Sequence, residues 1–258
     1  MSAIHPTAIV DPSAKIGSGV SVGPYAIIEA GVEIGASCEI GPHVVLRGPM
    51  RLGARNRIFQ FASIGEIPQD KKFAGETSSL EIGDDNTIRE FVTINRGTSD
   101  GGGATRIGDG NWIMAYVHIA HDCQVGNEVV FANGASLAGH VEVGDWATLG
   151  GFTLVHQFCR LGAGSFSAMG SCVRQDVPPF VTIAGDPALP HGINIEGLKR
   201  RGYPAASQQA IRSAYRTLYK RGLRLQEALD QLSHQGENEP GVAAFVDFIK
   251  ASERGIVR

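Results

Sequence analysis

Residues 16–46 read IGSGVSVGPYAIIEAGVEIGASCEIGPHVVL, and every sixth position of this stretch is Ile, Val or Leu. The same phase holds without interruption from Ile4 to Ile64. Chance produces a run of this length in roughly one in a few million cases, so the period is a property of the fold. The aliphatic positions are Ile4, Val10, Ile16, Val22, Ile28, Ile34, Ile40, Leu46, Leu52, Ile58 and Ile64.

A period of six fits neither an α-helix nor an ordinary alternating strand, and it is typical of a hexapeptide β-helix. Each hexad predicts one short strand and one tight corner, and three hexads make one triangular coil. The aliphatic side chain points into the prism, and the glycine that often follows it, as at Gly17 and Gly35, is expected to permit the corner. Coils stack about 4.8 Å apart, so roughly nine or ten coils are expected. A β-sandwich is the alternative, but its strands do not keep one phase over so long a stretch.

The repeat returns after two interruptions. It reappears at Ile82, Ile88 and Ile94, and then, slipped by one residue, at Ile107, Ile113, Ile119, Val125, Phe131, Leu137, Val143, Leu149, Val155 and Leu161. Residues 67–79 and 97–105 fit no hexad and predict loops that leave the corners of the prism. Such insertions lie on one face, often the binding face. The first loop carries Asp70, Lys71 and Lys72 and is the stronger functional candidate.

The period changes beyond residue 185. Apolar residues then recur at helical spacing, first at Ile211, Ala214, Tyr215, Leu218 and Tyr219 and later at Val242, Phe245, Val246 and Ile249. We therefore expect an all-β domain over residues 1–190 and a C-terminal helical domain over 191–258 that covers the last coil or a neighbouring subunit.

Bulk composition excludes several function classes. The formal charge of -3 gives no basic field for nucleic acid, and no stretch is apolar for long enough to span a membrane. The N-terminus lacks the pattern of a signal peptide. The four cysteines form no CxxC pair, which favours reduced, buried thiols over disulfides or zinc. A cytoplasmic protein is expected.

Four histidines gather in the second half of the prism: His118, His121, His140 and His156. The hexads that carry the last three begin one coil of eighteen residues apart, so these side chains should stack along one edge. An aligned set of imidazoles indicates a site that could supply a base. Zinc is the competing use, but the histidine spacing and the lack of convincing cysteine or carboxylate ligands argue against a metal.

Three further features are ambiguous from the residues alone. Asp122 follows His121 and either orients it or satisfies its own corner backbone. Gly139 precedes His140, and its amide either faces a developing oxyanion or is one more corner glycine. The run Lys199-Arg200-Arg201 either binds phosphate or forms a solvated helix face.

Five segments carry a family resemblance: Ile119-Ala-His-Asp-Cys123, Leu137-Ala-Gly-His140, Val155-His-Gln-Phe-Cys159, Gln175-Asp-Val-Pro-Pro179 and Asn194-Ile-Glu-Gly-Leu-Lys-Arg-Arg-Gly202. Together with Phe61-Ala-Ser-Ile-Gly-Glu66 and Gln69-Asp70, their order and spacing resemble the UDP-N-acetylglucosamine acyltransferases of lipid A synthesis. The resemblance implies a left-handed β-helix and a homotrimer with active sites between neighbouring prisms. It also implies transfer of a 3-hydroxyacyl group from acyl carrier protein to the 3-hydroxyl of UDP-N-acetylglucosamine, with no bound cofactor beyond the phosphopantetheine of the donor.

The resemblance also implies roles for single residues. His121 would be the general base, Asp122 would orient it, and the Gly139 amide would bind the oxyanion. The positions that match contacts to the sugar, the diphosphate or the donor are Asp70, Lys72, His118, His140, His156 and Gln157. Asn194, Glu196 and Arg200 match the nucleotide end, and Arg201 matches nucleotide or carrier contact. Met169 matches the residue that limits acyl length, so a chain of roughly ten carbons is expected, because surplus methylenes without a pocket cost discrimination.

Three rival functions remain open. The related N-acyltransferases carry an extra N-terminal domain, whereas hexads start here at Ile4. A coenzyme A dependent acetyltransferase and a non-catalytic scaffold are the other two, although the aligned histidines argue against a scaffold. A 3-amino sugar acceptor is not excluded by any residue.

Overall fold

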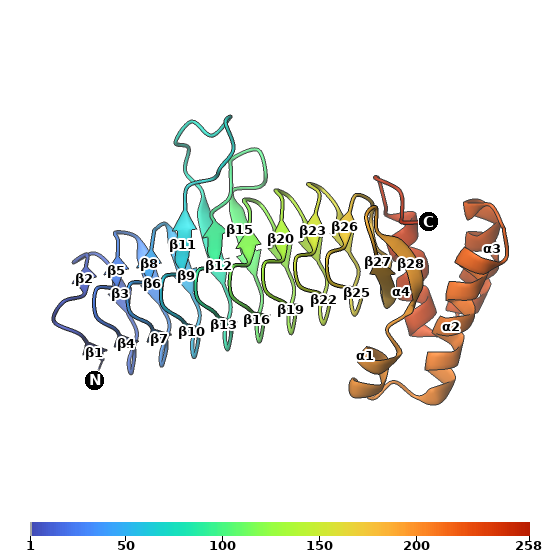
Figure 1. Cartoon of the computed structure of the whole chain (residues 1–258), viewed down its shortest axis with the longest axis horizontal. Helices are drawn as coiled ribbons and strands as arrows, with labels where there is room; N and C mark the ends of the chain where they lie inside the picture. Colours follow the sequence, from blue (N-terminus) through green and yellow to red (C-terminus); the bar gives the residue numbers. More distant parts are fainter. Residues whose placement is uncertain (1) are drawn as a thin grey trace.

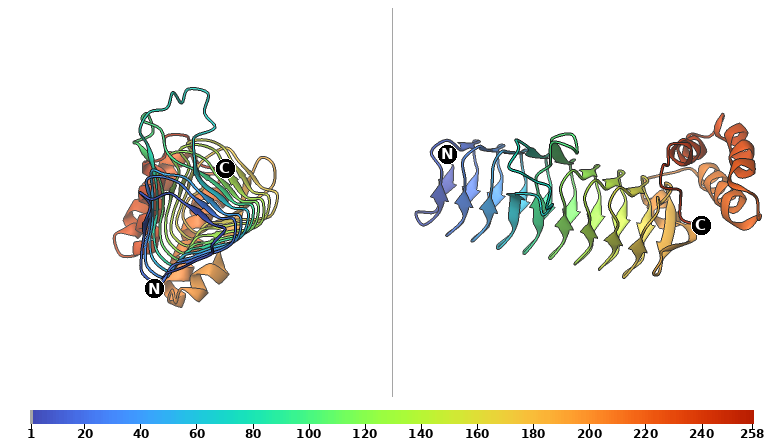
Figure 2. Two further views of the ribbon diagram at one scale, coloured as in Figure 1. Left: turned by 90° about the vertical axis from the view of Figure 1, so that its left-hand side faces the viewer. Right: turned by 90° about the horizontal axis from the view of Figure 1, so that it is seen from above.

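Three parallel sheets form the faces of a long prism in the computed structural model, which describes residues 2–258 (Figures 1 and 2). The chain visits face 1, face 2 and face 3 in turn, so each coil contributes one strand to each face. The predicted parallel β-helix is confirmed, and the triangular section is plain in the end-on view (Figure 2). We name the three edges by the faces they join: edge 1–2, edge 2–3 and edge 3–1.

The strands are short because each corner follows at once. Face 1 is 11-stranded and contains β1 (Ala3–Ile4), β4 (Ser21–Val22), β7 (Glu39–Ile40), β10 (Arg57–Ile58), β13 (Thr87–Ile88), β16 (Trp112–Ile113), β19 (Val130–Phe131), β22 (Thr148–Leu149), β25 (Phe166–Ser167), β27 (Val181–Ala184) and β28 (Leu189–Ile193). Face 2 is 9-stranded and contains β2 (Ile9–Val10), β5 (Ile27–Ile28), β8 (Val45–Leu46), β11 (Ser63–Glu66), β14 (Thr93–Asn95), β17 (His118–Ile119), β20 (Ser136–Leu137), β23 (Leu154–Val155) and β26 (Cys172–Val173). Face 3 is 8-stranded and contains β3 (Lys15–Ile16), β6 (Val32–Ile34), β9 (Met50–Leu52), β12 (Ser79–Ile82), β15 (Ala104–Ile107), β18 (Gln124–Val125), β21 (Glu142–Val143) and β24 (Arg160–Leu161).

The aliphatic residues of the repeat fill the interior of the prism, as predicted. From Val22 to Leu161 they are buried in one continuous core. The first coil is the exception, because within the described residues it has a neighbouring coil on one side only: Ile4 is 45% exposed, and Val10 and Ile16 are only partly buried. The buried apolar residues therefore stabilise the prism by packing each coil on the next.

The repeated glycines have a different role from the one predicted. The residue that takes the left-handed backbone conformation at a corner is usually not glycine, as at Phe61 (φ 63°) and His140 (φ 62°). The glycine directly after the aliphatic residue is needed for close approach between coils. A Cβ on Gly35 would lie 2.5 Å from the carbonyl carbon of Gly53 in the next coil. Only a glycine lets the two backbones come so near.

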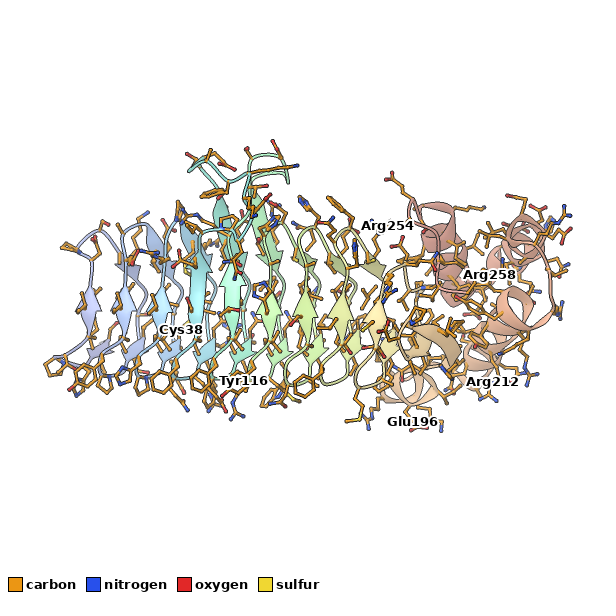
Figure 3. The ribbon with its side chains drawn as sticks, turned by 45° about the horizontal axis from the view of Figure 1, so that its top comes forward. Cys38, Tyr116, Glu196, Arg212, Arg254 and Arg258 are labelled. Atoms are coloured by element: carbon orange, nitrogen blue, oxygen red, sulfur yellow. The ribbon has the colours of Figure 1, made fainter. Side chains whose placement is uncertain are left out.

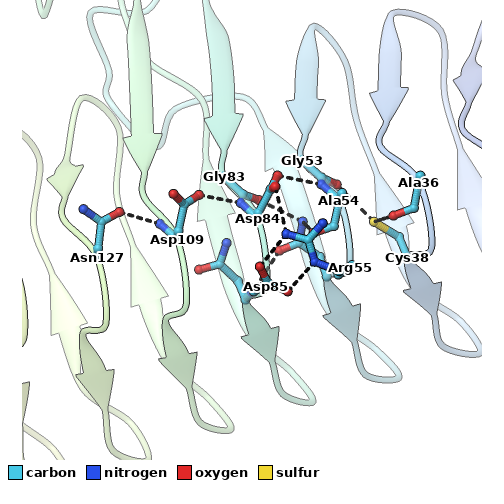
Figure 4. A network of polar contacts seen from close by, with 12 residues as sticks. Ala36, Cys38, Gly53, Ala54, Arg55, Gly83, Asp84, Asp85, Asp109 and Asn127 are labelled. Atoms are coloured by element: carbon cyan, nitrogen blue, oxygen red, sulfur yellow. Dashed lines mark hydrogen bonds and ion pairs between the residues drawn. The ribbon is translucent and has the colours of Figure 1, made fainter.

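Side chains join the coils along edge 3–1 (Figure 4). The Asp84 carboxylate accepts a hydrogen bond from the Ala54 amide at 2.8 Å, and the Asp109 carboxylate accepts one from the Asp84 amide at 2.6 Å. The Asn127 side chain accepts one from the Asp109 amide at 2.8 Å. Each acceptor lies one coil after its donor, so the row satisfies corner amides that the sheets leave unpaired.

A row of stacked rings runs along edge 1–2. It links Tyr25, His43, Phe61, Phe91 and Tyr116 with centroid separations of 4.9 to 5.2 Å. Tyr116 is at the last position of this row, on the outside of the prism (Figure 3). The stacking is a second contact between successive coils, made outside the core.

The two predicted loops both leave edge 2–3 and project side by side from the prism (Figure 1). The first connects β11 to β12 and the second connects β14 to β15. Buried Asn95 closes the base of the first loop by donating from its side chain to the Ile67 carbonyl at 2.8 Å. Both insertions are therefore placed on the edge that also carries the aligned histidines.

The C-terminal region closes the far end of the prism. β27 and β28 form an antiparallel pair, and four helices follow: α1 (Ile195–Arg200), α2 (Ala205–Lys220), α3 (Leu225–Gly236) and α4 (Pro240–Lys250). The apolar residues predicted at helical spacing are buried on α2 and α4, apart from half-buried Tyr219. The domain boundary expected between residues 190 and 191 falls inside β28, and α1 begins four residues later, at Ile195. None of the helices in the part of the chain that the structure describes is long and apolar enough to cross a bilayer.

Candidate active site

The four clustered histidines lie on neighbouring coils. His118 is on β17, His121 is in the corner that follows it, and His140 and His156 occupy the corners after β20 and β23. These three strands are adjacent in face 2, with His118 opposite Ser136 and Ser136 opposite Leu154. The eighteen-residue spacing thus places the imidazoles along edge 2–3, beside the two loops.

His121 and Asp122 form a hydrogen-bonded pair. The distance between His121 Nδ1 and the nearer Asp122 carboxylate oxygen, Oδ2, is 2.7 Å. A carboxylate only accepts, so Nδ1 carries the hydrogen. No described residue makes a hydrogen bond to Nε2 of this ring, which leaves its lone pair available. The arrangement is that of a general base with a carboxylate behind it.

The second loop holds Asp122 in place, a contact that the sequence analysis did not predict. The Thr98 amide and hydroxyl donate to the two carboxylate oxygens at 2.7 and 2.8 Å. The Asp122 amide donates to the Thr105 hydroxyl at 2.8 Å. All three residues are buried. The expectation that the first loop is the important one therefore misses Thr98 and Thr105.

His140 and His118 flank the pair. His140 Nε2 lies 3.7 Å from Asp122 Oδ2, and its ring stacks on Phe158 with a centroid separation of 4.4 Å. Burial lowers the pKa of His140, while the charges of Asp122 and Asp70 oppose that shift. Burial also lowers the pKa of His118, whose Nδ1 is 2.8 Å from the Thr93 hydroxyl. Both rings are thus favoured in the neutral form at neutral pH.

Gly139 lies against the His121 ring. A Cβ on Gly139 would lie 2.6 Å from Cε1 of that ring, so a larger residue would collide with the imidazole. Within residues 2–258 no acceptor pairs with the Gly139 amide. An unpaired N–H this close to the base is a donor available to a bound molecule.

A cavity of about 640 Å³ opens beside the pair. Its lining runs from Asp122 and His140 to Arg160 and Arg254, the latter from the C-terminal segment. His156 is at the rim, where its Nδ1 is 3.4 Å from an Arg254 guanidinium nitrogen. Gln157 is exposed next to it. The C-terminal segment thus reaches the histidine edge (Figure 3).

Asp70 and Lys72 lie in the first loop. The Asp70 carboxylate accepts from the Lys72 amide at 3.0 Å, which forms a tight turn, and the Lys72 side chain is exposed. Asp70 is near enough for its charge to act on His140. The loop therefore brings one acidic and one basic group to the same edge.

The donor set for a metal is present in part. One ligand atom each from His121, Asp122 and His140 lies within 4.8 Å of the others. However, the Asp122 carboxylate already accepts hydrogen bonds from Thr98 and His121. A cation at this point would have to displace the His121 Nδ1–H, so we keep the prediction that the site uses no metal.

The residues matched to the nucleotide line a second cavity of about 580 Å³. Asn194, Glu196, Arg200 and Arg201 all contribute, together with Trp146 and other residues. Asn194 caps α1 by accepting from the Gly197 amide at 2.9 Å, and Lys199 pairs with Glu196 at 2.8 Å. This grouping favours the binding interpretation of the basic run over a solvated helix face.

Arg201 is the most unusual member of this cavity. Its guanidinium carbon lies 5.7 Å from the Trp146 ring centroid, and burial lowers its pKa. Its Nη2 is buried and makes no hydrogen bond to any described residue. A desolvated guanidinium without a carboxylate partner is suited to binding an anion.

The two groups of residues do not meet within one chain. The histidines lie on edge 2–3, whereas the second cavity is built on face 1 and edge 3–1 from Trp146, Thr148, Phe166 and Thr182. Met169 is on edge 1–2, after β25, and is 80% exposed. One subunit thus presents its histidine edge and its nucleotide-end cavity in different directions.

A prism of hexapeptide coils with a histidine–carboxylate pair on its edge defines a hexapeptide-repeat acyltransferase. The family model described as bacterial transferase hexapeptide (six repeats) matches residues 4–48 and 104–139. The model described as UDP N-acetylglucosamine O-acyltransferase, domain 2, matches residues 176–257.

Relatives extend the match to the whole chain. The acyl-[acyl-carrier-protein]–UDP-N-acetylglucosamine O-acyltransferase of Janthinobacterium sp. (strain Marseille) is 62% identical and that of Thiobacillus denitrificans is 59% identical, each with 100% of both chains covered. The structure of LpxA from Acinetobacter baumannii is 46% identical with a TM-score of 0.96 and 99% of both chains covered. The Francisella novicida UDP-N-acetylglucosamine acyltransferase is 42% identical with a TM-score of 0.97, covering 99% of this chain and 94% of that one.

The chain therefore belongs to the UDP-N-acetylglucosamine O-acyltransferase family, and it is an enzyme of that kind. The family inferred from the motifs and the left hand of the β-helix are both confirmed. The rival families, including the N-acyltransferases with an additional domain, are not needed to explain any part of the chain.

Proposed function

We propose that this enzyme transfers a 3-hydroxyacyl group from acyl carrier protein to the 3-hydroxyl of UDP-N-acetylglucosamine, the first step of lipid A synthesis, with His121 as the general base. The observation that carries the proposal is the 2.7 Å contact between His121 Nδ1 and Asp122 Oδ2. It leaves Nε2 of the ring, which lies beside Gly139, without a hydrogen-bond partner among the described residues. Histidine is the side chain that most often serves as a general base near neutral pH.

The chemistry follows from these atoms. His121 Nε2 takes the proton of the sugar hydroxyl as the oxygen attacks the thioester carbonyl. The resulting oxyanion is stabilised by the Gly139 amide, and Asp122 stabilises the imidazolium. When the tetrahedral intermediate collapses, the carbon–sulfur bond breaks and the imidazolium returns the proton to the thiolate of phosphopantetheine. No cofactor of the enzyme is consumed, because the carrier supplies phosphopantetheine.

The remaining residues of edge 2–3 are assigned to substrate binding. Asp70, Lys72, His118, His140, His156 and Gln157 are proposed to contact the sugar, the diphosphate or the acyl donor. Asn194, Glu196, Arg200 and Arg201 are proposed to bind the nucleotide. Arg201 supports this role most directly, because its buried Nη2 lacks a partner among the described residues.

A homotrimer with sites between subunits supports both groups at once. One chain presents the histidine edge and the nucleotide-end cavity on different sides of its prism. A single substrate can contact both only if the cavity comes from a neighbouring copy. Cyclic association of three copies provides this contact three times over. We place the enzyme in the cytoplasm, where acyl carrier protein and nucleotide sugars would both be present.

Met169 is proposed to limit acyl length to about ten carbons, since each methylene without a pocket costs discrimination. Its exposed side chain is on edge 1–2, and face 2 separates this edge from the edge that carries His121.

The deciding assay offers a series of 3-hydroxyacyl carrier proteins with UDP-N-acetylglucosamine, and reads the acylated sugar by mass. The expected product is an ester with a short acyl chain, and His121→Ala should reduce its formation by about 10²-fold or more. Parallel reactions use coenzyme A thioesters and the 3-amino sugar nucleotide. Faster reaction with either of these, or full activity of His121→Ala, would overturn the proposal.

A further inference from the structure

The second ejected loop, residues 97–105, covers the carboxylate of Asp122. This side chain is 0% exposed, although it lies at an outer corner of the prism. The cover is tight, because a Cβ on Gly101 would overlap the Asp122 carboxyl carbon. The loop therefore excludes water from the carboxylate on the side opposite His121.

Thr98 contacts both oxygens of that carboxylate. Its amide donates to Oδ1 at 2.7 Å and its hydroxyl donates to Oδ2 at 2.8 Å. Oδ2 is also the atom that accepts from His121 Nδ1. With both oxygens held by one residue, the carboxylate cannot rotate without losing two charge-assisted hydrogen bonds at once.

The loop is itself anchored, so Thr98 is a fixed point. The Gly103 amide donates to the Thr98 carbonyl at 2.8 Å, and the Ser79 amide donates to the Gly103 carbonyl at 2.9 Å. Ser79 begins β12, so the loop is tied to the end of the first loop and to face 3. The orientation of Asp122 thus depends on the prism through Thr98.

We infer that Thr98 is a positioning residue for the transfer reaction, holding Asp122 so that His121 keeps its hydrogen on Nδ1 and its lone pair on Nε2. The inference rests on the proposed role of His121 as base. Thr98 touches no substrate, and its effect passes entirely through Asp122. The loop is then part of the catalytic apparatus, and a mere surface insertion would have no such effect.

Two substitutions at Thr98 separate the contribution of its hydroxyl from that of its backbone amide and its side-chain shape. Thr98→Val keeps the shape and the amide bond to Oδ1 but removes the bond to Oδ2, and Thr98→Ser restores the hydroxyl. Thr98→Val should lower kcat by about tenfold to a hundredfold with KM for both substrates nearly unchanged, and Thr98→Ser should recover most of it. Ser99→Ala, which removes an exposed hydroxyl from the same loop, is the control and should behave as the wild type.

A double-mutant cycle tests whether Thr98 acts on the reaction through Asp122. In an Asp122→Ala background, Thr98→Val should cost nothing further, because the carboxylate through which it acts is gone. Equal losses in both backgrounds, or a loss only in KM, would overturn the inference. Gly101→Ala is a second approach to the same point, and should lower kcat by pushing the loop off Asp122.

The outcome for His121 keeps the two proposals apart. If His121→Ala stays active, the proposed base is wrong and Thr98 has no role to support. If His121→Ala is inactive while Thr98→Val has full kcat and an unshifted pH profile of kcat/KM, only the inference about Thr98 fails.

Discussion

Asp122 turns back onto the residue that directly precedes it, so that two consecutive side chains share a 2.7 Å hydrogen bond. Asp122 has a φ of 62°, the left-handed conformation that one residue adopts at many corners of the prism. Aspartate tolerates this conformation better than most residues. The corner geometry of the β-helix is therefore also what points the carboxylate at the His121 ring.

The first prediction concerns this pair. Asp122→Asn keeps the size of the side chain but replaces a pure acceptor with an amide, whose nitrogen would face a donor from Thr98 or from His121. The ring should then favour the wrong tautomer, and kcat should fall by about 10² to 10³-fold. Steady-state kinetics measures this, with the melting temperature as the control for folding. A variant that melts like the wild type and keeps its kcat would contradict the role of Asp122.

The second prediction tests whether sites form between subunits. His121→Ala and the double variant Glu196→Ala/Arg200→Ala should each be nearly inactive alone, because each lacks one half of every site. When both are co-expressed in equal amounts with different tags, every trimer that contains both variants should have both intact halves at one of its three sites, about one third of the wild-type activity. The activity of the hetero-trimers purified through both tags measures this fraction. Complete absence of recovery would mean that each chain carries its own complete site.

The third prediction concerns acyl length. Met169→Gly should move the preferred donor to longer chains, because it removes the side chain that fills the end of the acyl path. The change should raise the rate with the longer donors by about tenfold or more relative to the wild type. Because Met169 is 80% exposed, the variant should fold normally. Met169→Leu, which keeps the bulk, is the control; an unchanged profile in Met169→Gly would exclude this residue as the limit.

The fourth prediction is a dependence of stability on pH. Burial lowers the pKa of His118, so the unfolded chain binds a proton more tightly than the native one. As pH falls below about 6.5, unfolding takes up a proton and the free energy of unfolding decreases, down to the lower native pKa. Urea midpoints at about pH 7.5 and about pH 5.5 should differ less in His118→Gln than in the wild type.

The matched control for this experiment is His234→Gln, which removes a histidine whose side chain is 86% exposed. It should leave the difference between the two midpoints as in the wild type. Equal pH dependence in His118→Gln and the wild type would show that His118 does not contribute.

Most of the fold could be predicted from the local periodicity of the sequence. A period of six fixes which side chain of each hexad points inward, and an interruption of the period marks a loop, so the prism and both insertions could be predicted. The role of the repeated glycines could not, because the close approach at Gly35 depends on the backbone of the following coil. The antiparallel return of β28 was also missed, since it follows the end of the repeat.

The candidate site was also predictable in part, because the period places the histidines but not the residues of the loops. The eighteen-residue coil aligned the histidines, and the structure brings them together on one edge. Asp122 was noted only because it follows His121, and its role was implied by the family resemblance. Thr98 was beyond reach, because a loop with no period has no register from which its neighbours can be derived.

The row of side chains along edge 3–1 has a consequence for how the protein is made. Asp84 satisfies the amide of Ala54, and Asn127 satisfies that of Asp109, always one coil later than the donor. During synthesis the coils leave the ribosome in the same order, so each newly emerged turn completes the one before it, and its own corner amide is completed by the turn that follows. The prism would therefore form in one direction, coil by coil from the N-terminal end. The C-terminal helices emerge last and complete it.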